Sequence, residues 1–525
     1  MRENVSSQPA HRLVAAALAL SCLAACGGGG GGGGVSLVSG DQDADPVVVE
    51  IPIAYVRRPV PEQFSDVRDP LAFNPGAQLR LRERASTTAE DIDITRQITA
   101  IVAEELATEA DNLQVDIKGL ESSFDGKTII FAARVVPEPV AANLETTTWN
   151  LWQLDVESEQ ASYLIPSRIK RNEGLESGGA QDIAPHFLPD DRIVFSSTRQ
   201  IASQARQLNE GRAQIFSALD EDRRSPAAVL HIYDPQLRNE EFQQISFNLS
   251  HDLDPTVLAS GEILFSRWNN TATDHISLYR VEPSGAGLAP VYGFHSQNTG
   301  TDGARIVFTQ ARQLDDGRLA SVVHNVSPQS LGGEILLIDS ANYADADQGR
   351  WENRSSGGSG QESLTDTEVR SDEMLSRGGQ YGSVYPLRDG TGRLLVTWSE
   401  CRVVDADTAL EDGQIASAGD LAPCTLQPDN TDAAPPLYGA WVYDPAADTQ
   451  RPLVIAKEGL WISEVIAAEN RDFPTVLPMD ERFNPAPRHG LIAPQPGIHR
   501  SSESTWSWKF RYYYPPYDPQ LPGPD

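Results

Sequence analysis

The most regular feature of the sequence is a polar turn followed by a run of β-branched, aliphatic or aromatic residues. Each turn contains Asp or Gly, which tolerate the backbone angles of tight turns, and each run is rich in residues that favour strands. The repetition predicts a series of similar β-structured units. Five copies occur, at residues 120–134, 183–199, 253–268, 311–323 and 384–400.

A second strand pattern, ending in an acidic or polar residue, follows each copy. These patterns lie at residues 149–156, 229–235, 276–283, 334–339 and 439–445. The paired units recur every ~55–75 residues without alternating with helices, which is typical of propeller blades built from four short strands. A β-sandwich is the alternative, although it needs fewer than five similar units. We therefore predict an all-β fold, a β-propeller of four-stranded blades.

Strand patterns also flank the repeats. Residues 47–56 lie upstream of the first copy and residues 461–468 downstream of the last. Pairing of these two segments would close the ring, because a propeller joins its first and last strands in one blade. We expect five to seven blades, with six as the preferred number, over residues 47–495. Residues 496–525 form a tail rich in Pro and aromatic residues.

Three insertions interrupt the repeats, so the predicted propeller carries helical and loop insertions. Residues 201–224 predict a helix, because they are rich in Ala, Gln, Arg, Leu and Glu and are followed by Pro226,. Residues 343–376 are rich in Gly, Ser and acidic residues and predict a loop,. Residues 403–436 are the third insertion.

The N-terminus predicts a secretory signal peptide at residues 1–25, with a charged start, a short apolar run and small residues before the cleavage site. Arg2 and Arg12 supply the charge, and residues 13–20 contain only Leu, Val and Ala. This run is too short to span the roughly 30 Å hydrocarbon core of a bilayer, which takes about 20 residues.

Residues 23–26, Leu-Ala-Ala-Cys, resemble the bacterial lipobox. The resemblance implies cleavage before Cys26 and a lipid on its sulfur; the alternative is an ordinary signal peptide whose cleavage happens to leave a cysteine. Eight glycines at residues 27–34 belong to a flexible tether over residues 26–46,. Gly27, in place of Asp, implies the outer membrane under the sorting rule of enteric lipoproteins. We therefore predict a lipid-anchored cell-envelope protein on the periplasmic or surface-facing side.

The composition restricts the class of partner. The formal net charge is −32 and the sequence pI is about 4.6. An acidic surface repels phosphate backbones, so we expect no nucleic-acid binding. No second long apolar run follows residue 25, so we expect the membrane contact to be the lipid anchor.

The four cysteines have separable roles. Cys22 leaves with the signal peptide, and Cys26 takes the lipid. Cys401 and Cys424 remain in a compartment that permits disulfides. We expect them to form one, which would stabilise the fold by about 2–4 kcal/mol. A pair of free or metal-binding thiols is the alternative, although no neighbouring cluster of His and Cys supports a zinc site.

The core of the second copy, residues 185–199, resembles the repeat of TolB-type propellers. The longer stretches 182–200 (DIAPHFLPDDRIVFSSTRQ) and 244–258 (QISFNLSHDLDPTVL) resemble proteins related to the middle domain of the hydrazine synthase alpha subunit. The segments ISLYR at 276–280 and YGFHSQNTG at 292–300 fit the same pattern. The resemblance covers roughly residues 110–470 and implies the propeller fold.

Hydrazine synthase depends on covalently attached haem, whose attachment needs Cys-x-x-Cys-His. This sequence has no such motif. The resemblance therefore implies neither haem c nor hydrazine synthesis.

Two consecutive repeats share an Asp-x-x-Pro motif, at 182–185 and 252–255. In a structural interpretation, each Asp caps a turn through backbone N–H groups and each Pro fixes the start of a strand. In a functional interpretation, His and Asp side chains gather at the axial face and bind Zn²⁺ or another divalent ion. The residues of this possible metal site are His186, His251, Asp252, Asp254 and His295.

Motifs of known catalytic chemistry are missing from the sequence. It contains neither the Gly-x-Ser-x-Gly elbow nor His-Glu-x-x-His,. We therefore predict a cell-envelope lipoprotein whose propeller binds a protein partner or a small ligand, with no cofactor. A metal-dependent envelope enzyme with an axial site is one alternative, and a structural envelope component is another.

Overall fold

The structure is a computed structural model. The chain divides into two compact units, residues 1–44 and 45–525, and every described residue belongs to the second. The predicted signal peptide, the lipid-bearing Cys26, its tether and the C-terminal tail lie outside the described residues, as does the predicted helix at 201–224 apart from Leu219. The structure describes residues 50–60, 68–166, 179–200, 219, 226–237, 242–269, 275–325, 332–353, 358–365, 368–372, 374–404, 421–424, 434–477, 485–486 and 491–492.

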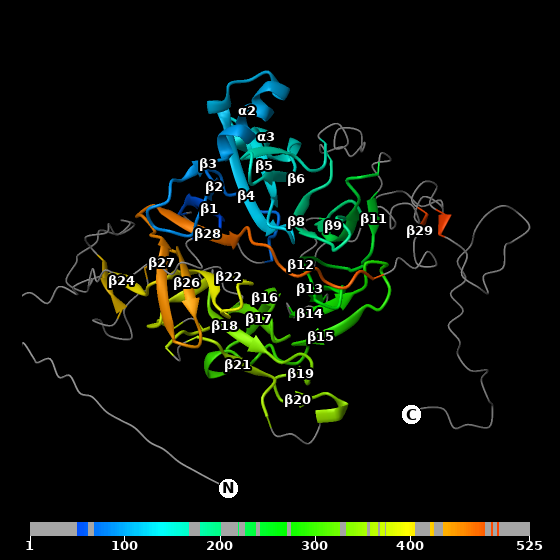
Figure 1. Cartoon of the computed structure of the whole chain (residues 1–525), viewed down its shortest axis with the longest axis vertical. Coiled ribbons are helices and arrows are strands. Elements are labelled where there is room, and N and C mark those ends of the chain that lie inside the picture. The colour runs from blue at the N-terminus through cyan, green and yellow to red at the C-terminus, as the bar shows by residue number, and fades with distance from the viewer. Residues whose placement is uncertain are drawn as a thin grey trace, which may run out of the picture. The chain divides into compact units, whose positions relative to one another are not determined.

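Six four-stranded antiparallel sheets form the described part of the second unit (Figure 1). The innermost strands of successive sheets contact one another in the order β4, β8, β12, β16, β22 and β28, and β28 contacts β4 again. The contacts therefore close a ring, and the predicted β-propeller with six blades is confirmed.

Five sheets follow the chain order from the inside of the ring outward. They are β4 (Leu113–Ser122), β5 (Thr128–Pro137), β6 (Asn150–Asp155) and β7 (Gln160–Tyr163); β8 (Asp182–Phe187), β9 (Ile193–Ser197), β10 (Val229–Tyr233) and β11 (Phe242–Gln244); β12 (Asp252–Val257), β13 (Ile263–Asn269), β14 (His275–Val281) and β15 (Ala289–Tyr292); β16 (Ile306–Gln313), β17 (Leu319–Asn325), β18 (Glu334–Ile338) and β21 (Gln361–Ser363); and β22 (Gln380–Pro386), β23 (Leu394–Ser399), β26 (Gly439–Asp444) and β27 (Thr449–Val454).

The sixth sheet joins the two ends of the repeat region. Its order is β28 (Leu460–Ala467), β1 (Ile53–Pro59), β2 (Gln78–Arg82) and β3 (Ile92–Asp93). Strand β1 pairs antiparallel with β28 from Ile53 opposite Ala467 to Pro59 opposite Leu460. The predicted pairing of the chain ends is confirmed, because residues more than 400 positions apart form one ladder.

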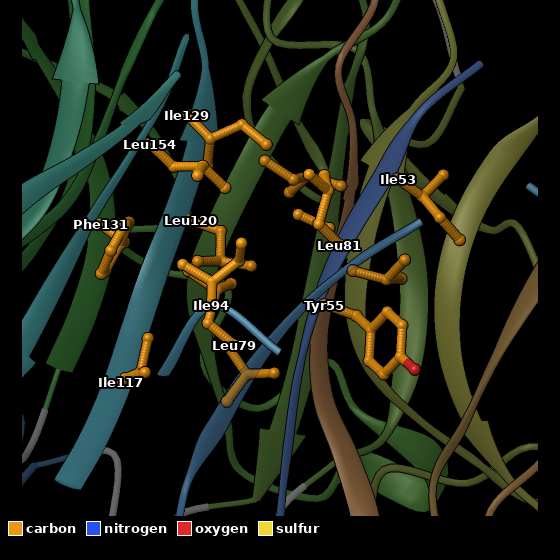
Figure 2. Packing of buried hydrophobic residues seen from close by; sticks show 14 of the residues in the cluster. Ile53, Tyr55, Leu79, Leu81, Ile94, Ile117, Leu120, Ile129, Phe131 and Leu154 are labelled. Carbon is orange, nitrogen blue, oxygen red and sulfur yellow. The ribbon is translucent and has the colours of Figure 1, made fainter. Parts of the chain in front are cut away.

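The largest group of buried apolar side chains surrounds this closing sheet. Ile53 and Tyr55 from β1 pack near Leu79 and Leu81 from β2, and the neighbouring sheet contributes Phe131 (Figure 2). Full burial of one such side chain stabilises a fold by roughly 1.5–3 kcal/mol. The closing sheet is therefore held by packing against its neighbours as well as by strand pairing.

Short elements connect or decorate the blades. Helix α2 (Thr95–Leu106) follows the closing sheet and ends at Ala107 in the left-handed conformation. Among the described residues, no helix is long and apolar enough to cross a membrane. The remaining elements are α3 (Val140–Asn143), η1 (Ala110–Asn112), η2 (Leu144–Thr146), η3 (Thr301–Gly303), η4 (Trp351–Asn353), β19 (Tyr343–Asp345), β20 (Gln348–Gly349), β24 (Arg402–Val404), β25 (Leu421–Pro423), β29 (Pro485–Ala486) and β30 (Leu491–Ile492).

Two insertions contain more structure than their composition indicated. The predicted loop at 343–376 contains β21, which completes a blade by pairing with β18. The loop prediction is wrong for this strand because Gln-Glu-Ser lies at the solvated outer edge and shows no apolar alternation,. In the other insertion, β24 pairs with β25 beside the predicted disulfide, which joins Cys401 and Cys424 with their Cα atoms 5.5 Å apart.

Candidate functional site

A cavity of about 270 Å3 lies where the innermost strands of all six blades converge. A segment that precedes β2 adds Asp69, Pro70, Ala72 and Asn74 to its wall. The cavity is therefore the axial pocket of the propeller. Two lining residues from each inner strand are Lys118 and Gly119 (β4), Ala184 and Pro185 (β8), Asp254 and Pro255 (β12), Gln310 and Arg312 (β16), Ser383 and Tyr385 (β22), and Glu464 and Ile466 (β28).

β-Bulges direct these residues toward the axis. The pairing of β4, β8, β12 and β16 with the second strand of each sheet shifts register at an equivalent place in these four blades. A bulge bends its strand and redirects a side chain. The bulged residues with positive φ are Gly119 (69°), Ala184 (50°), Asp254 (48°) and Gln310 (50°).

Three of these four bulged residues are not glycine. A left-handed backbone conformation costs on the order of 1–3 kcal/mol for such a residue. Ala184, Asp254 and Gln310 all adopt it beside the cavity. Strain of this kind concentrates at functional sites, which singles out the axial cavity as a candidate.

The segment from Asp69 to Asn74 covers one end of the cavity. Lys118 donates from Nζ to the carbonyl oxygen of Pro70. Trp149 donates from Nε1 to the carbonyl oxygen of Leu71 over 3.1 Å, and Asp116 Oδ2 accepts from the backbone N–H of Asn74 over 2.6 Å. Side chains of the first blade therefore hold this cover in place.

Asp116 is fully buried and paired. Its Oδ1 lies 3.0 Å from Arg58 Nη1 and also accepts from the backbone N–H of Ile117 over 2.8 Å. Arg58 in turn donates to the carbonyl oxygen of Ile117 over 2.5 Å. This ion pair joins the closing sheet to the first blade. Its two charges compensate each other, so Asp116 is a poor partner for a charged ligand.

A compact ionic cluster lies at the other end of β4 and reaches the cavity through Arg312. Glu121 accepts from Arg312 and, over 2.5 Å, from Arg471. His186 Nε2 lies 3.4 Å from the same carboxylate. Burial alone would raise the pKa of Glu121, but its attraction to Arg312, His186 and Arg471 outweighs burial and lowers the pKa. We name Glu121, Arg312, Arg471 and His186 the base cluster.

Burial lowers the pKa of His186 to about 4. The imidazole is therefore neutral at neutral pH, and the two arginines neutralise Glu121. His186 Nε2 also lies 3.3 Å from Thr256 Oγ1, and Nδ1 lies 2.9 Å from the carbonyl oxygen of Phe187. Both ring nitrogens have partners, so His186 acts as a packed polar residue in the base cluster.

The chain that follows β28 runs across the ring (Figure 1). The backbone N–H of Arg471 donates to the carbonyl oxygen of Phe124, in the turn after β4, over 2.8 Å. The backbone N–H of Thr475 donates to the carbonyl oxygen of Ala259, in the turn after β12, over 3.0 Å. Strands β4 and β12 belong to different blades, so this strap, residues 469–477, ties together two blades and positions the Arg471 guanidinium.

Between the two ends, the charged groups are less well compensated. Burial lowers the pKa of Lys118 to about 8, although Asp116 opposes the shift. Lys118 Nζ lies 3.8 Å from the centre of a Trp149 ring, a cation–π contact that favours the charged form. Lys118 retains some solvent exposure because it faces the cavity.

Asp254 lies on β12 and also faces the cavity. Burial raises its pKa, and the opposing influences come from the backbone N–H of Gln310, from Arg312 and from Lys118. Glu464, on β28, accepts from the backbone N–H groups of Gly119 and Leu120 over 3.1 and 2.9 Å. Both carboxylates therefore interact with bulge amides on another blade.

The structure does not gather the five predicted metal-site residues. Only Asp254 lines the cavity, while His186 belongs to the base cluster. His251 Nδ1 accepts from the backbone N–H of Ala228 over 3.0 Å. His295 packs its ring against Phe294, with centroids 4.9 Å apart.

Asp252, the fifth residue, is fully buried within its own blade. Its carboxylate accepts from Ser246 Oγ over 2.6 Å and from Asn248 over 3.1 Å, and lies 3.5 Å from Arg267. Burial raises the pKa of Asp252 to about 6. The expected role of this Asp as a turn cap is therefore wrong, since its partners are side chains.

The Asp of the other Asp-x-x-Pro motif, at 182–185, also has side-chain partners. Asp182 accepts from Ser197 Oγ over 2.7 Å and pairs with Arg199. Pro185 and Pro255 lie within bulges, not at strand starts. Across the described residues, no group of three or more His, Cys, Asp or Glu side chains is arranged to hold a metal ion. Metal binding at the axial face stays a prediction.

No family model and no curated protein matches the chain. Among solved structures, hydrazine synthase from Kuenenia stuttgartiensis is similar, with a TM-score of 0.50 and 14% identity over 81% of this chain and 48% of that one. This chain therefore spans about half the length of that protein.

Two further solved structures have lower scores. Oligogalacturonate lyase in complex with manganese has a TM-score of 0.31 and 11% identity, over 75% of this chain and 84% of that one. A putative TolB from Agrobacterium tumefaciens has a TM-score of 0.30 and 12% identity, over 61% and 91%. At such identities the comparisons bear on fold alone. The six-sheet ring and the hydrazine synthase structure together confirm the predicted propeller and its resemblance to that family as a likeness of fold.

Proposed function

We propose that this protein is a cell-envelope lipoprotein whose propeller binds a small polar ligand in the axial cavity. The observation that carries the proposal is a cavity of about 270 Å3 lined by all six inner strands, with charged side chains of both signs. Ligand pockets commonly enclose roughly 300–1,000 Å3. The cavity therefore suits a small molecule better than a protein segment.

The lining argues against a purely structural core. Burying a polar or charged group costs free energy unless a partner compensates it. Lys118 and Asp254 both have pKa values shifted by burial toward the neutral form. An apolar filling would stabilise the ring better, so these groups are best explained by a ligand that they contact.

The anchor supports a location at the cell envelope. The lipobox-like segment ends at Cys26, and eight glycines follow. A lipid on Cys26 would hold the protein at the outer membrane, and the flexible tether would keep the propeller clear of the headgroups. Mass spectrometry of the purified protein should show the lipid mass, and Cys26→Ala should abolish that mass and release the protein from membranes. Membrane retention without lipid would contradict this part of the proposal.

An envelope enzyme that uses the same cavity is a second candidate. Lys118 has its pKa lowered to about 8 and Asp254 has its pKa raised. Opposite shifts within one cavity are a signature of acid–base chemistry. Turnover of a bound ligand that is lost in both Lys118→Met and Asp254→Asn would favour this candidate over binding alone.

Ligand binding is testable with the full-length lipoprotein purified in detergent. Calorimetric titration with small amino acids, amines, carboxylates and sugars should reveal saturable binding to the wild type. Lys118→Met and Asp254→Asn should weaken it. The matched controls are Lys127→Met and Asp125→Asn, since these two residues form an exposed pair on the turn after β4. Absence of binding by every compound would contradict the proposal.

A further inference from the structure

We infer that the ligand of the axial cavity is a small zwitterion, a molecule of amino-acid size that carries both an ammonium group and a carboxylate. This inference rests on the proposed function, because it specifies the chemistry of the same site. Its starting point is a pair of opposite charges, Lys118 and Asp254, that face one cavity without meeting.

Lys118 supplies the cationic side of the site. Its Nζ donates to the carbonyl oxygen of Pro70 and lies against Trp149. These partners are neutral, and no carboxylate of the described residues lies within 4 Å of Nζ. Asp116, Asp69 and Glu464 attract the ammonium group without forming a salt bridge with it, and a ligand carboxylate would be its direct ionic partner.

Asp254 supplies the anionic side. Among the described residues it forms no salt bridge, and its nearby hydrogen-bond donor is the backbone N–H of Gln310. Arg312, which attracts Asp254, is already bound to Glu121. Asp254 therefore lacks a dedicated cation, which a ligand ammonium group would provide.

The order of the blades keeps the two charges apart. Strand β8 lies between β4, which carries Lys118, and β12, which carries Asp254. The residues that β8 presents to the cavity are Ile183, Ala184 and Pro185, all without charge. A ligand that bridges the two charges would rest its carbon skeleton on this apolar wall.

A further carboxylate, Glu464, also faces the cavity. Glu464 belongs to β28, which lies opposite β12 in a ring of six inner strands. Its two oxygens accept from backbone N–H groups, which are neutral donors. With Asp69 on the covering segment, the cavity offers three carboxylates outside the Arg58–Asp116 pair and one ammonium group outside a salt bridge, so a ligand with a carboxylate alone would leave Asp254 uncompensated.

The size and the charges of the cavity argue against a neutral or a singly charged ligand. A cavity of about 270 Å3 suits a small molecule,. A neutral sugar would form hydrogen bonds but compensate neither charge, and a singly charged ligand would leave one buried charge unpaired. A zwitterion compensates both.

The test uses calorimetric titration of the full-length protein in detergent with defined probes. The zwitterions are the twenty amino acids and γ-aminobutyrate; the singly charged probes are butyrate, n-butylamine and the primary amides of the amino acids; glucose is the neutral probe. We expect at least one zwitterion to bind at least tenfold more tightly than its own amide and than every other singly charged or neutral probe.

Substitutions of Lys118 and Asp254 test which charged group of the ligand each side chain binds. Lys118→Met should weaken zwitterion binding at least tenfold and make the amino acid and its amide bind equally, because the carboxylate has lost its partner. Asp254→Asn should weaken the zwitterion and the amide alike, since both carry the ammonium group. Lys118→Arg should restore part of the preference for the amino acid, which separates a charge effect from a folding defect. Lys127→Met should leave all affinities unchanged.

The outcomes distinguish this inference from the proposed function. If a sugar or a singly charged probe binds as tightly as any zwitterion, the zwitterion inference is wrong and the axial ligand site stands. If the best zwitterion keeps its preference over its amide in Lys118→Met, the assignment of Lys118 is wrong. If no probe of any class binds the wild type, both the inference and the proposed function fail.

Discussion

The base and the middle of the axial cavity bury charge in two different ways. In the base cluster, Glu121 contacts Arg312 and Arg471, so its negative charge has direct cationic partners. In the middle, Lys118 and Asp254 face the same space from two blades without forming a salt bridge. The paired charges fix the geometry of the ring, whereas the separated charges raise its free energy. We propose that the base serves the fold and the middle serves a ligand.

The largest expected effect comes from breaking the base cluster. Glu121→Gln removes the carboxylate that two partly buried arginines share, which leaves uncompensated charge inside the protein. Loss of one partner of a buried ion pair typically costs about 3–5 kcal/mol. Urea denaturation should show a decrease of this size in the free energy of unfolding. A decrease below about 1 kcal/mol, the range of an exposed ion pair, would contradict a structural role for the base.

The pH dependence of stability should report on His186. Burial lowers its pKa to about 4 in the folded state, below the value of about 6.5 in an unfolded chain. The folded protein therefore disfavours proton binding, so the associated stability is present above pH 6.5 and is lost as the pH falls toward 4. At pH 5 the loss should reach about 2 kcal/mol for this group.

The matched comparison for this prediction is His186→Gln. Denaturation curves at pH 7 and pH 5 should show a smaller loss of stability in the variant than in the wild type. Burial also lowers the pKa of His231 to about 4, so the variant should keep part of the pH dependence. An identical loss in both proteins would show that His186 takes no part in it.

The strap offers a smaller and more local test. At Gly261, φ is +85° and an added Cβ would lie 2.0 Å from the carbonyl oxygen of Thr475. Gly317 has φ of +87° with open space around it. Both alanine variants share the backbone strain, so Gly261→Ala should cost about 1–3 kcal/mol more than Gly317→Ala because it displaces the strap. Equal thermal stability of the two would show that the strap contributes nothing.

The smallest expected effect on stability is a gain, from Asp254→Asn. Asp254→Asn removes a carboxylate whose pKa burial raises, so the ionised side chain destabilises the folded state at neutral pH. Relieving such a functional compromise typically gains about 0.5–2 kcal/mol. Thermal unfolding of Asp254→Asn without ligand should therefore match or exceed the wild type. A loss comparable to that of Glu121→Gln would remove the distinction between the two regions.

Much of the architecture was predictable because it depends on features that repeat. The turn-and-strand units locate the first two strands of five blades, and the flanking strand patterns predict the closure between β1 and β28. The disulfide followed from the fates of the other two cysteines. Strand β21 was not predictable, since its Gln-Glu-Ser sequence carries no apolar alternation.

The axial site was only partly predictable, because its chemistry lies at bulges. Gly119, Ala184, Asp254 and Gln310 occupy equivalent places on their strands but share no residue type, so the repeat hides them. Asp254 entered the sequence analysis through its neighbouring His and Asp residues, while Lys118 and Glu464 were missed. Aligning the copies one strand earlier, on the residues that precede each turn, would have brought these positions together.

The most direct test of the central claim is a crystal structure of the protein grown with the amino acid that binds it most tightly. We predict ligand density beside Ala184, with the ligand carboxylate within hydrogen-bond distance of Lys118 Nζ and its ammonium group within hydrogen-bond distance of Asp254. A direct salt bridge between Lys118 and Asp254, with water alone in the cavity, would contradict the account.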